Sequence, residues 1–306
     1  MNAEFELGLR EMTTSSSALT REIGSYILDG GGKRLRPKLV LLMGEAVGLD
    51  QEQTLPLAYA VELLHNASLL HDDVVDGTEI RRSRPTANQV FGDKPALLAG
   101  DYLSASALDI VFALGNVRLA SQIVKTIKKM AEGELLEIEH AAGFHDKLDV
   151  YLQIIYLKTA SLFELCTMAP GIVVGLGGDE IDALAEFGRS IGMAFQIVDD
   201  IINLAPLDQD DKDAYNDITE RKSTLPLINL FHTEPALLGV LNQSSSPEDW
   251  CREIIPRLNP DLLNQSRALA ESFLTQAIKA VDGKGFITPQ LERIPAIVLA
   301  PLEHRF

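Results

Sequence analysis

The stretch SLLHDDVVDGT, residues 68–78, places three aspartates at the end of an otherwise apolar helical segment. At helical pitch Asp72 and Asp76 share one face, with Asp73 beside them, and like charges at that spacing repel. A solvated helix face is the ordinary explanation of an acidic run. Leu64 and Ser68, however, occupy the same row one and two turns earlier, and a solvent-facing row is not expected to carry them. We therefore expect a bound cation here.

The surrounding residues predict a long helix. One face is apolar, and Thr54 followed by Pro56 predicts its start while Gly77 predicts its end. The apolar face comprises Leu57, Ala60, Val61, Leu64 and Ala67. Similar periodicity covers residues 101–115, 116–142, 148–170 and 179–205, with Pro206 ending the last segment. The pattern predicts an all-α protein.

The domain organisation expected from this pattern is a single domain over residues 1–306. No internal repeat or βαβ unit is present, and short polar spacers occur at TTSSS, residues 13–17, and NQSSSPEDW, residues 242–250. The run GIVVGLGG, residues 171–178, has a strand-like composition but no strand to pair with. It is better interpreted as a helix with a glycine-rich end.

Composition restricts the partners and the compartment. The net charge of −17 and the pI near 4.7 make nucleic acid and anionic membrane surfaces poor general partners. The two cysteines, Cys166 and Cys251, show no paired spacing, which is typical of a reducing cytoplasm. No uninterrupted apolar run reaches the roughly 18 residues of a membrane span. We expect a cytoplasmic protein without a membrane span, for which a lipid is a substrate or product.

A second acidic cluster lies in FQIVDDIIN, residues 195–203. Asp199 continues the apolar row of Phe187, Ile191 and Phe195, with Asn203 one turn later, which predicts that Asp199 points inward. A buried carboxylate must be protonated, paired or bound to metal. The two clusters would then face each other across a helical bundle and share ions. Carboxylate and amide oxygens favour Mg²⁺ or Ca²⁺, and Mg²⁺ commonly completes its ligand set with water and phosphate oxygens.

Cations gather in a few places despite the acidic composition. GGGKRLRP, residues 30–37, places Lys33, Arg34 and Arg36 after three glycines, and RRSRP follows the first aspartate cluster at residues 81–85. Further lysines occur at Lys158, Lys212 and Lys222. Each alone is an ordinary surface cation, but glycine-rich backbone and cations together can hold an anion. The set predicts two anionic sites, one bridged by metal and one purely basic.

These blocks together resemble the trans-isoprenyl diphosphate synthases of the polyprenyl synthetase family. The resemblance runs in consistent order from about residue 28 to about residue 230, and the first aspartate block followed by two arginines is its most specific part. The matching blocks are residues 30–37, 63–86, 96–103, 131–139, 156–164, 195–203 and 217–226. The resemblance implies an all-helical isoprenoid synthase-type bundle around a deep central cavity and a homodimer. It also implies head-to-tail addition of isopentenyl diphosphate to an allylic diphosphate.

The resemblance assigns roles to individual residues. Asp72, Asp76 and Asp199 would bind Mg²⁺ directly, supported by Asp73, Asp200 and Asn203. Arg81, Lys158 and Lys212 would hold the allylic diphosphate, with Lys222 nearby. Thr159 and Gln196 would stabilise the allylic cation, and the departing diphosphate would accept the proton. Isopentenyl diphosphate would bind Gly32, Lys33, Arg36, His65 and Arg82, although a lone helical histidine is more often structural.

Product length is predicted from the turn before Asp72. Ala67 and Ser68 are both small, and in the family small residues there accompany long products. We expect geranylgeranyl diphosphate or a longer polyprenyl diphosphate. The alternative is that these residues merely allow close helix packing.

Departures from the family pattern leave two alternatives open. Asn203 replaces a usual aspartate, Glu137 stands where glutamine is common, and Ser83 and Arg221 replace usual glycines. A terpene cyclase on the same fold often has Ser or Thr at the position of Asn203 and Glu at the position of Leu207. A non-catalytic subunit of a heteromeric synthase would usually have lost part of the first aspartate motif, which is intact here.

Overall fold

A computed structural model describes residues 3–205, 214–244, 246–286, 288–303 and 305. Apart from the two-residue strands β1 (Ile80–Arg81) and β2 (Arg84–Pro85), the regular elements of this part of the chain are helices. The all-α prediction is confirmed. The chain divides into two compact units, which we describe separately.

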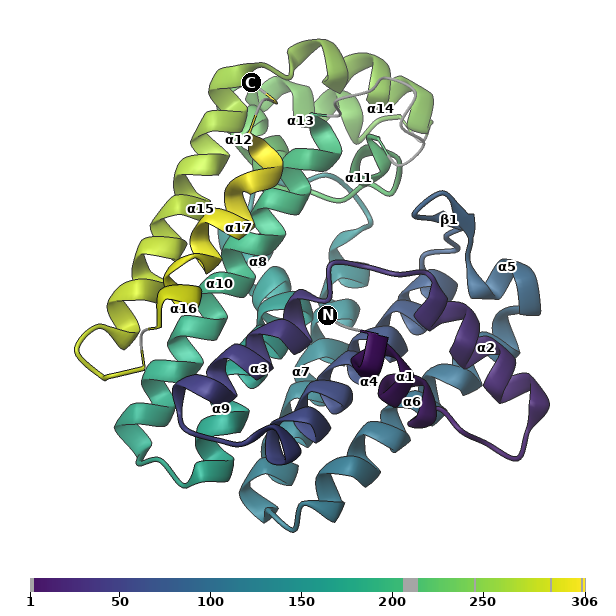
Figure 1. The fold of residues 1–306 in the computed structure, drawn as a ribbon. Coiled ribbons are helices and arrows are strands. Elements are labelled where there is room, and N and C mark those ends of the chain that lie inside the picture. Colours follow the sequence, from purple (N-terminus) through teal and green to yellow (C-terminus); the bar gives the residue numbers. More distant parts are fainter. Residues whose placement is uncertain (1–2, 206–213, 245, 287, 304, 306) are drawn as a thin grey trace. The chain divides into compact units, whose positions relative to one another are not determined.

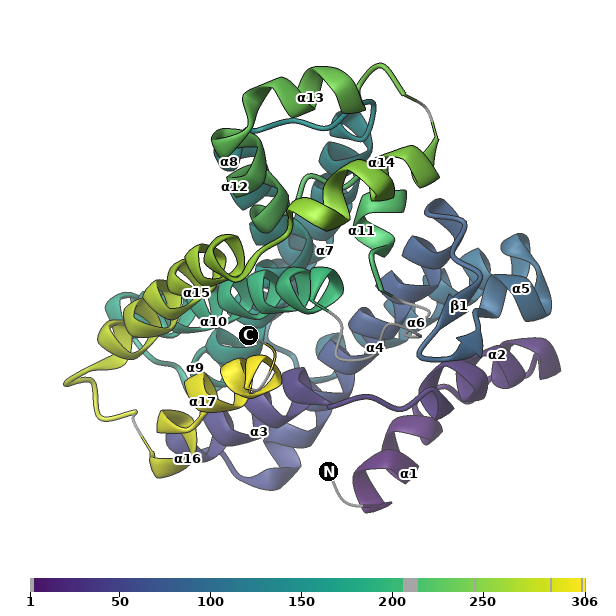
Figure 2. The ribbon, with the colours of Figure 1, turned by 90° about the horizontal axis from the view of Figure 1, so that it is seen from above.

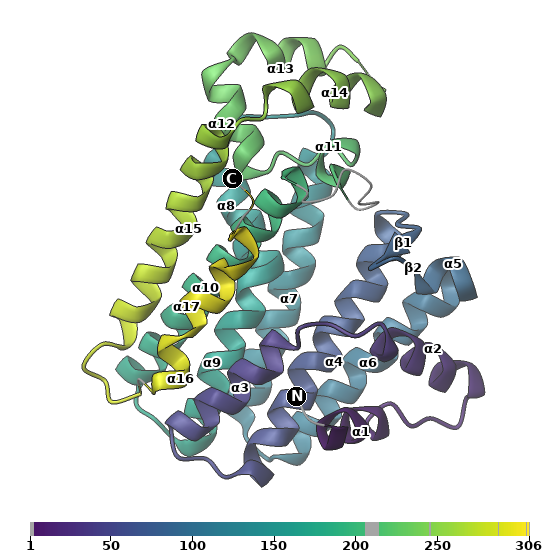
Figure 3. The same cartoon turned by 45° about the horizontal axis from the view of Figure 1, so that its top comes forward.

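The first unit comprises Met1–Lys128, Leu162–Ala185 and Lys284–Thr288. Within it, α4 packs along α6, and α3 packs on α4 (Figures 1 and 3). Its helices are α1 (Ala3–Glu11), α2 (Ala18–Asp29), α3 (Leu35–Ala46), α4 (Gln51–Val75), α5 (Ala87–Phe91), α6 (Asp93–Ala113), the start of α7 (Val117–His140), nearly all of α9 (Ser161–Val174) and the start of α10 (Gly178–Leu204).

Helix α4 carries the apolar face that the sequence predicted, and each of its five members is at most 3% exposed. Its predicted start was wrong. The helix begins at Gln51, because the Asp50 side chain caps it by accepting a hydrogen bond from the Gln53 amide at 2.9 Å. Pro56 therefore lies inside the helix, where it removes one backbone hydrogen bond. The predicted end was correct to within a residue, with Asp76 as the C-cap before Gly77.

The short hairpin that follows α4 was not predicted. Ile80 pairs with Pro85 and Arg81 with Arg84, which leaves Arg82 and Ser83 as the two turn residues. Both have positive φ, 52° and 60°, as a type I′ turn requires. Ser83 therefore occupies a backbone conformation that glycine would adopt with less strain.

The second unit comprises Lys129–Ser161, Glu186–Gly283 and Pro289–Phe306. Within it, α12 packs on α15, and α11 on α14 (Figure 2). A core that includes Phe144, Phe231 and Trp250 lies beneath the short helices. Besides parts of α7 and α10, the unit contains α8 (Leu148–Ile155), the π-helix η1 (Tyr156–Ala160), α11 (Asn216–Thr219), α12 (Leu225–Thr233), α13 (Pro235–Leu241), α14 (Pro247–Ile254), η2 (Ile255–Arg257), α15 (Pro260–Val281), α16 (Pro289–Glu292), α17 (Ile294–Leu299) and η3 (Ala300–Leu302).

Two helical stretches are long and apolar enough to cross a membrane by length and composition alone, Asp93–Ala113 and Leu148–Val174. In the second, 83% of the apolar window is buried inside the protein, as expected of a core helix. In the first, 33% is buried. That helix is α6, which packs on α4 and α2. Length and composition are weak criteria, so the absence of a membrane span stays a prediction.

Candidate active site

The first aspartate cluster lies at the C-terminal end of α4, where the helix emerges from the core. Leu64 is buried, Ser68 and Asp72 are half-buried and Asp76 is exposed, so the row becomes accessible towards its end. Asp73 points elsewhere. It is 1% exposed and accepts a hydrogen bond from Arg81 Nε at 2.8 Å. Burial raises the pKa of Asp73, and the Arg81 charge opposes that rise. The supporting role of Asp73 in metal binding stays a prediction.

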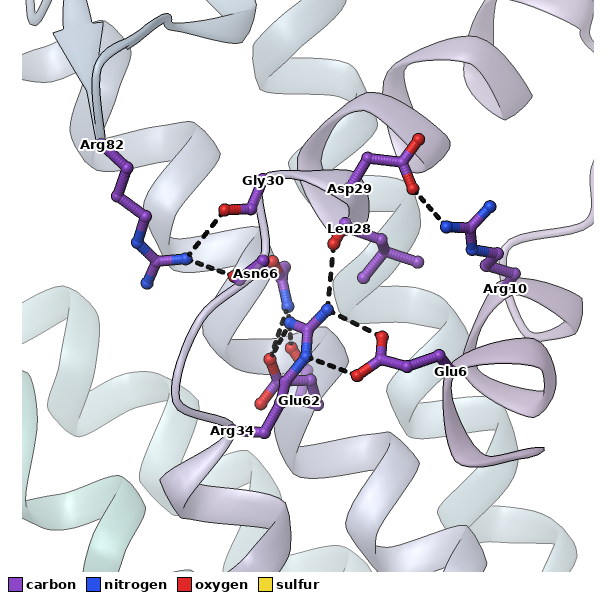
Figure 4. Close-up of polar contacts among 10 residues, drawn as sticks. Glu6, Arg10, Leu28, Asp29, Gly30, Arg34, Glu62, Asn66 and Arg82 are labelled. Atoms are coloured by element: carbon purple, nitrogen blue, oxygen red, sulfur yellow. Dashed lines mark hydrogen bonds and ion pairs between the residues drawn. The ribbon is translucent and has the colours of Figure 1, made fainter. Parts of the chain in front are cut away.

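The glycine-rich loop between α2 and α3 lies against the hairpin turn. Arg82 Nη1 donates to the carbonyl of Gly31, and a weaker contact reaches Gly30 at 3.5 Å (Figure 4). A Cβ atom on Gly32 would come within 2.8 Å of the Arg82 guanidinium. The loop therefore requires glycine for this close approach. Lys33, which follows Gly32, is exposed.

Arg36 and His65 are in contact within the first unit. Arg36 Nη1 lies 3.2 Å from His65 Nε2, and its guanidinium stacks on Phe163 with 4.8 Å to the ring centre. Burial and the positive charge of Arg36 lower the pKa of His65 well below its ordinary value. The imidazole is therefore neutral near pH 7, and Nε2 accepts the hydrogen bond from Arg36. Four residues predicted for isopentenyl diphosphate, namely Gly32, Arg36, His65 and Arg82, thus occur as two contacting pairs.

The second cluster differs from the prediction in one respect. Asp199 is exposed, so the inference that its carboxylate is buried was wrong. The buried carboxylate belongs to Asp200, which is 5% exposed. The two side chains diverge because adjacent helical residues are about 100° apart, and the apolar row already becomes half-buried at Phe195.

Asp200 is the centre of a buried hydrogen-bond network. Its carboxylate accepts from the Tyr151 hydroxyl at 2.6 Å and from Gln196 Nε2 at 2.9 Å. Gln196 Oε1 in turn accepts from the Thr159 hydroxyl at 2.7 Å. Burial and the nearby Asp199 charge raise the pKa of Asp200 to about 7, although the bonds from Tyr151 and Gln196 oppose this. The network fixes the two residues predicted to stabilise the allylic cation, Thr159 and Gln196.

Lys158 is held by two carboxylates from α7. Its Nζ lies 2.7 Å from Glu134 and also donates to Glu137. The approach is possible because Gly133 has no side chain, since a Cβ there would come within 2.6 Å of the Lys158 amide nitrogen. Lys158 lies in the π-helix η1, a local distortion frequent at functional sites. Lys222 pairs with Glu220 at 2.6 Å, and Lys212 lies outside the described residues.

Asn203 ends the second cluster and contacts the segment that follows the undescribed residues. Its side-chain oxygen accepts the Asp217 amide at 3.2 Å, and its carbonyl accepts the Tyr215 amide at 3.0 Å. Burial and the charge of Asp200 raise the pKa of Asp217 well above its ordinary value. Asp217 is thus a further acidic member of this region.

The sequence reasoning missed both Asp217 and Tyr151. Asp217 opens the quoted block at residues 217–226, which was the available signal. Tyr151 carries no motif, and its role emerges only from the fold.

The described residues contain no group of three Asp, Glu, His or Cys side chains that could close on one metal ion. An ion held here must take oxygens from water or from a ligand. That requirement fits Mg²⁺, which keeps several waters and binds phosphates. In the first unit the half-buried Asp72 and the exposed Asp76 offer oxygen donors of the required type, and in the second unit the exposed Asp199 does so.

The residues predicted to limit product length differ in burial. Ala67 is 1% exposed and packs within the first unit, whereas Ser68 is half-buried, with its hydroxyl bonded to the His65 carbonyl at 2.9 Å. Close packing therefore describes Ala67 well. Ser68 is the more accessible member of the pair.

Comparison with known proteins identifies the family of the chain. The family model described as polyprenyl synthetase matches residues 17–256, and the chain belongs to that family. It is 36% identical over 223 residues to octaprenyl diphosphate synthase of Escherichia coli, covering 72% of this chain and 69% of that protein.

Two solved structures are similar over nearly the whole chain. A decaprenyl diphosphate synthase from Rhodobacter capsulatus superposes with a TM-score of 0.87 at 32% identity, covering 99% of this chain and 96% of that one. A polyprenyl synthase from Caulobacter crescentus, crystallised with calcium and isoprenyl diphosphate, gives 0.85 at 27% identity, covering 99% and 94%. The predicted all-α isoprenoid synthase fold is confirmed.

Proposed function

We propose that this chain is a trans-prenyl diphosphate synthase that condenses isopentenyl diphosphate with an allylic diphosphate, head to tail. The product is geranylgeranyl diphosphate or a longer polyprenyl diphosphate. The observation that carries the proposal is the end of α4, where Asp72 and Asp76 become accessible while Arg81 and Arg82 follow on the hairpin. Carboxylate oxygens and guanidinium cations therefore adjoin within one compact unit, which supports a site for a metal-bound diphosphate.

The proposed reaction begins with cleavage of the allylic C–O bond, and the diphosphate leaves with the electron pair. The double bond of isopentenyl diphosphate then attacks the allylic carbon, a C–C bond forms, and a proton passes to the departing diphosphate. Bound Mg²⁺ supplies positive charge to the leaving group. Asp72, Asp76 and Asp199 would hold it, and Lys158 would neutralise further charge on the diphosphate.

The hydrogen-bond network of the second unit supports this assignment. Thr159 and Gln196 are fixed through Asp200 and Tyr151. Their oxygen dipoles are therefore oriented before substrate arrives, which lowers the cost of stabilising a cation. We place isopentenyl diphosphate on Gly32, Lys33, Arg36, His65 and Arg82.

We further propose that the two units act as one domain and that the enzyme is a cytoplasmic homodimer without a membrane span. Support for the dimer comes from exposed apolar side chains on α6 and at the start of α7. Leu98 is 67% exposed, Phe112 62% and Val117 83%.

The test incubates the purified chain alone with Mg²⁺, farnesyl diphosphate and labelled isopentenyl diphosphate. Incorporation of label into longer diphosphates supports the proposal. A cyclic hydrocarbon would instead identify a cyclase, and no product would favour a non-catalytic subunit. Arg36→Ala should mainly raise the KM for isopentenyl diphosphate. Lys158→Ala should mainly impair the step in which the allylic diphosphate reacts. Equal effects of both variants on both substrates would contradict two separate anion sites.

A further inference from the structure

Arg34 lies between two residues of the proposed isopentenyl diphosphate site, Lys33 and Arg36, but its own side chain is only 6% exposed. The guanidinium binds Glu6 through both carboxylate oxygens, at 3.1 and 3.0 Å (Figure 4). It also donates to Glu62 at 2.5 Å and to the Leu28 carbonyl at 2.9 Å. Four of its five N–H donors are therefore used within the protein.

These contacts make Arg34 unsuitable as a direct substrate ligand. A diphosphate would have to displace two carboxylates from a guanidinium that is 6% exposed, whereas Lys158, which also pairs with two carboxylates, is 21% exposed. Removing one partner of such a buried pair leaves an uncompensated charge, which is strongly unfavourable. The arginine must therefore act through the residues that it holds.

The first segment that Arg34 holds is the glycine loop between α2 and α3. Leu28 lies in the last turn of α2 and Arg34 directly precedes α3, so the bond from the Arg34 side chain to the Leu28 carbonyl closes the loop at its base. Gly31 and Gly32 have φ values of 67° and 139°, and glycine in such a loop is intrinsically free to move. Arg34 itself has a left-handed φ of 48°, a costly conformation for a side chain of this size. The four hydrogen bonds of its guanidinium offset that cost.

The second segment that Arg34 holds, through Glu62, is the turn of α4 that carries His65. Glu62 is 3% exposed, and its carboxylate accepts from Arg34 as well as from Asn66 at 3.3 Å. His65 lies between Glu62 and Asn66 on the same turn and contacts Arg36, two residues after Arg34. Arg34 is thus close to Arg36 in the chain, and its partner Glu62 is on the same turn as His65. The Arg34–Glu62 ion pair therefore links the segments that carry Arg36 and His65.

We propose that Arg34, with Glu6 and Glu62, is a positioning residue for isopentenyl diphosphate. It fixes the glycine loop and the Arg36–His65 pair in the binding conformation and makes α1, through Glu6, part of that site. This inference rests on the proposed function.

The kinetic test compares Arg34→Lys and Glu6→Gln with Arg10→Gln. Lysine cannot reproduce the bidentate fork, and Glu6→Gln removes one carboxylate charge while leaving the bond to Glu62. Arg10 is a matched control, because it also joins α1 to the end of α2, through Asp29 at 2.5 Å. This pair is exposed, and within the described part of the chain its side chains do not bond to the carbonyls of the glycine loop (Figure 4). We expect the KM for isopentenyl diphosphate to rise roughly tenfold in the two test variants, as loss of preorganisation would cause. The KM for farnesyl diphosphate should change less than about twofold, and the control should change neither.

Amide hydrogen exchange of residues 31–33 provides a readout that does not depend on turnover. In the unliganded chain, exchange should be faster in Glu6→Gln than in the parent and unchanged in Arg10→Gln. If the parent fails to elongate substrate, the proposed function fails while this comparison still tests the positioning. Unchanged exchange, or equal rises in both KM values, would overturn the inference. If Arg34→Lys does not fold, Glu6→Gln decides.

Discussion

Within each pair of adjacent aspartates, one carboxylate is buried and hydrogen-bonded and the other is more accessible. Asp73 bonds to Arg81, and Asp200 bonds to Tyr151 and Gln196. Asp72 is half-buried and Asp199 is exposed. Adjacent helical positions point about 100° apart, so one pair can contribute both a ligand and a support. The direct and supporting metal roles assigned to the members of each pair stay predictions.

The first prediction concerns the more accessible aspartate of each pair, Asp72 and Asp199. Asp72→Ala or Asp199→Ala should lower turnover by roughly a hundredfold or more, because each deletes a charge needed at the leaving group, while circular dichroism stays helical. Glu79→Ala and Asp182→Ala, which remove exposed carboxylates nearby in the chain, are the controls. Near-normal turnover of Asp72→Ala at saturating Mg²⁺ would contradict the metal assignment.

The second prediction concerns pH and His65. Burial and the charge of Arg36 lower its pKa below 6.5 in the folded state, so below about pH 6.5 the unfolded chain binds more protons. Stability should therefore fall as the pH is lowered, by up to about 1.4 kcal/mol per pH unit from this group. The raised pKa of Asp200, about 7, has the opposite effect, since it favours folding as the pH falls towards 4.

Urea unfolding of the parent and of His65→Gln between pH 5 and 8 separates the two groups. Glutamine can still accept from Arg36 but does not titrate. The difference in unfolding free energy should be constant above pH 7 and should shift in favour of the variant at lower pH. Parallel curves throughout would exclude a depressed histidine pKa.

At the scale of the helices, the spacing of apolar residues predicted which helix faces are buried. The apolar faces of α4 and α10 and the glycine-rich end of α9 after Val174 agree with the structure. The predicted N-cap of α4 differs from the structure. Asp50 and Thr54 are both good capping residues, and the sequence does not show which of them the chain uses. The hairpin was missed because neither Arg82 nor Ser83 is a residue that favours positive φ.

The site was predictable as a set of residue types but not as a set of contacts. Arg34 reaches Glu6 and Glu62, each 28 positions away, and Tyr151 reaches Asp200 across 49 positions. Such pairings depend on tertiary structure, which no local spacing encodes. The same holds for the exposure of Asp199, since an apolar row can leave the core within one turn.

The third prediction belongs to α4 and concerns product length. Ser68 is half-buried, so Ser68→Phe should shorten the product while activity is retained, if a tail runs past this turn. Ala67 is fully packed, and Ala67→Phe should destabilise the fold by about 1–3 kcal/mol through overpacking. Mass spectrometry of the products and urea unfolding measure the two effects. An unchanged product length in a stable, active Ser68→Phe variant would leave the turn with a packing role only.

For the whole molecule, the contrast between an acidic chain and local cations restricts what it can bind. A net charge of −17 disfavours general polyanions, whereas the first unit concentrates arginines at its loop and hairpin. Small diphosphates can reach such cations without requiring a broad basic surface. The absence of a nucleic acid partner stays a prediction from the charge.

The fourth prediction tests the proposed dimer. Light scattering should give twice the chain mass of 33.5 kDa for the parent and a substantial shift towards the single chain for Phe112→Glu. A charge placed in an apolar interface would lack a partner. Val240→Glu, at a position 53% exposed on α13, is the control and should leave the mass unchanged. A monomeric parent would contradict the homodimer.

The most direct test of the central claim is the mass of the product formed from geranyl diphosphate and excess isopentenyl diphosphate. The purified chain with Mg²⁺ should yield a series that grows by one five-carbon unit per condensation and extends to geranylgeranyl diphosphate or beyond. Chelation of the metal should abolish the series. Growth that stops at farnesyl diphosphate would contradict the proposed length, and absence of any elongated diphosphate would contradict the enzyme itself.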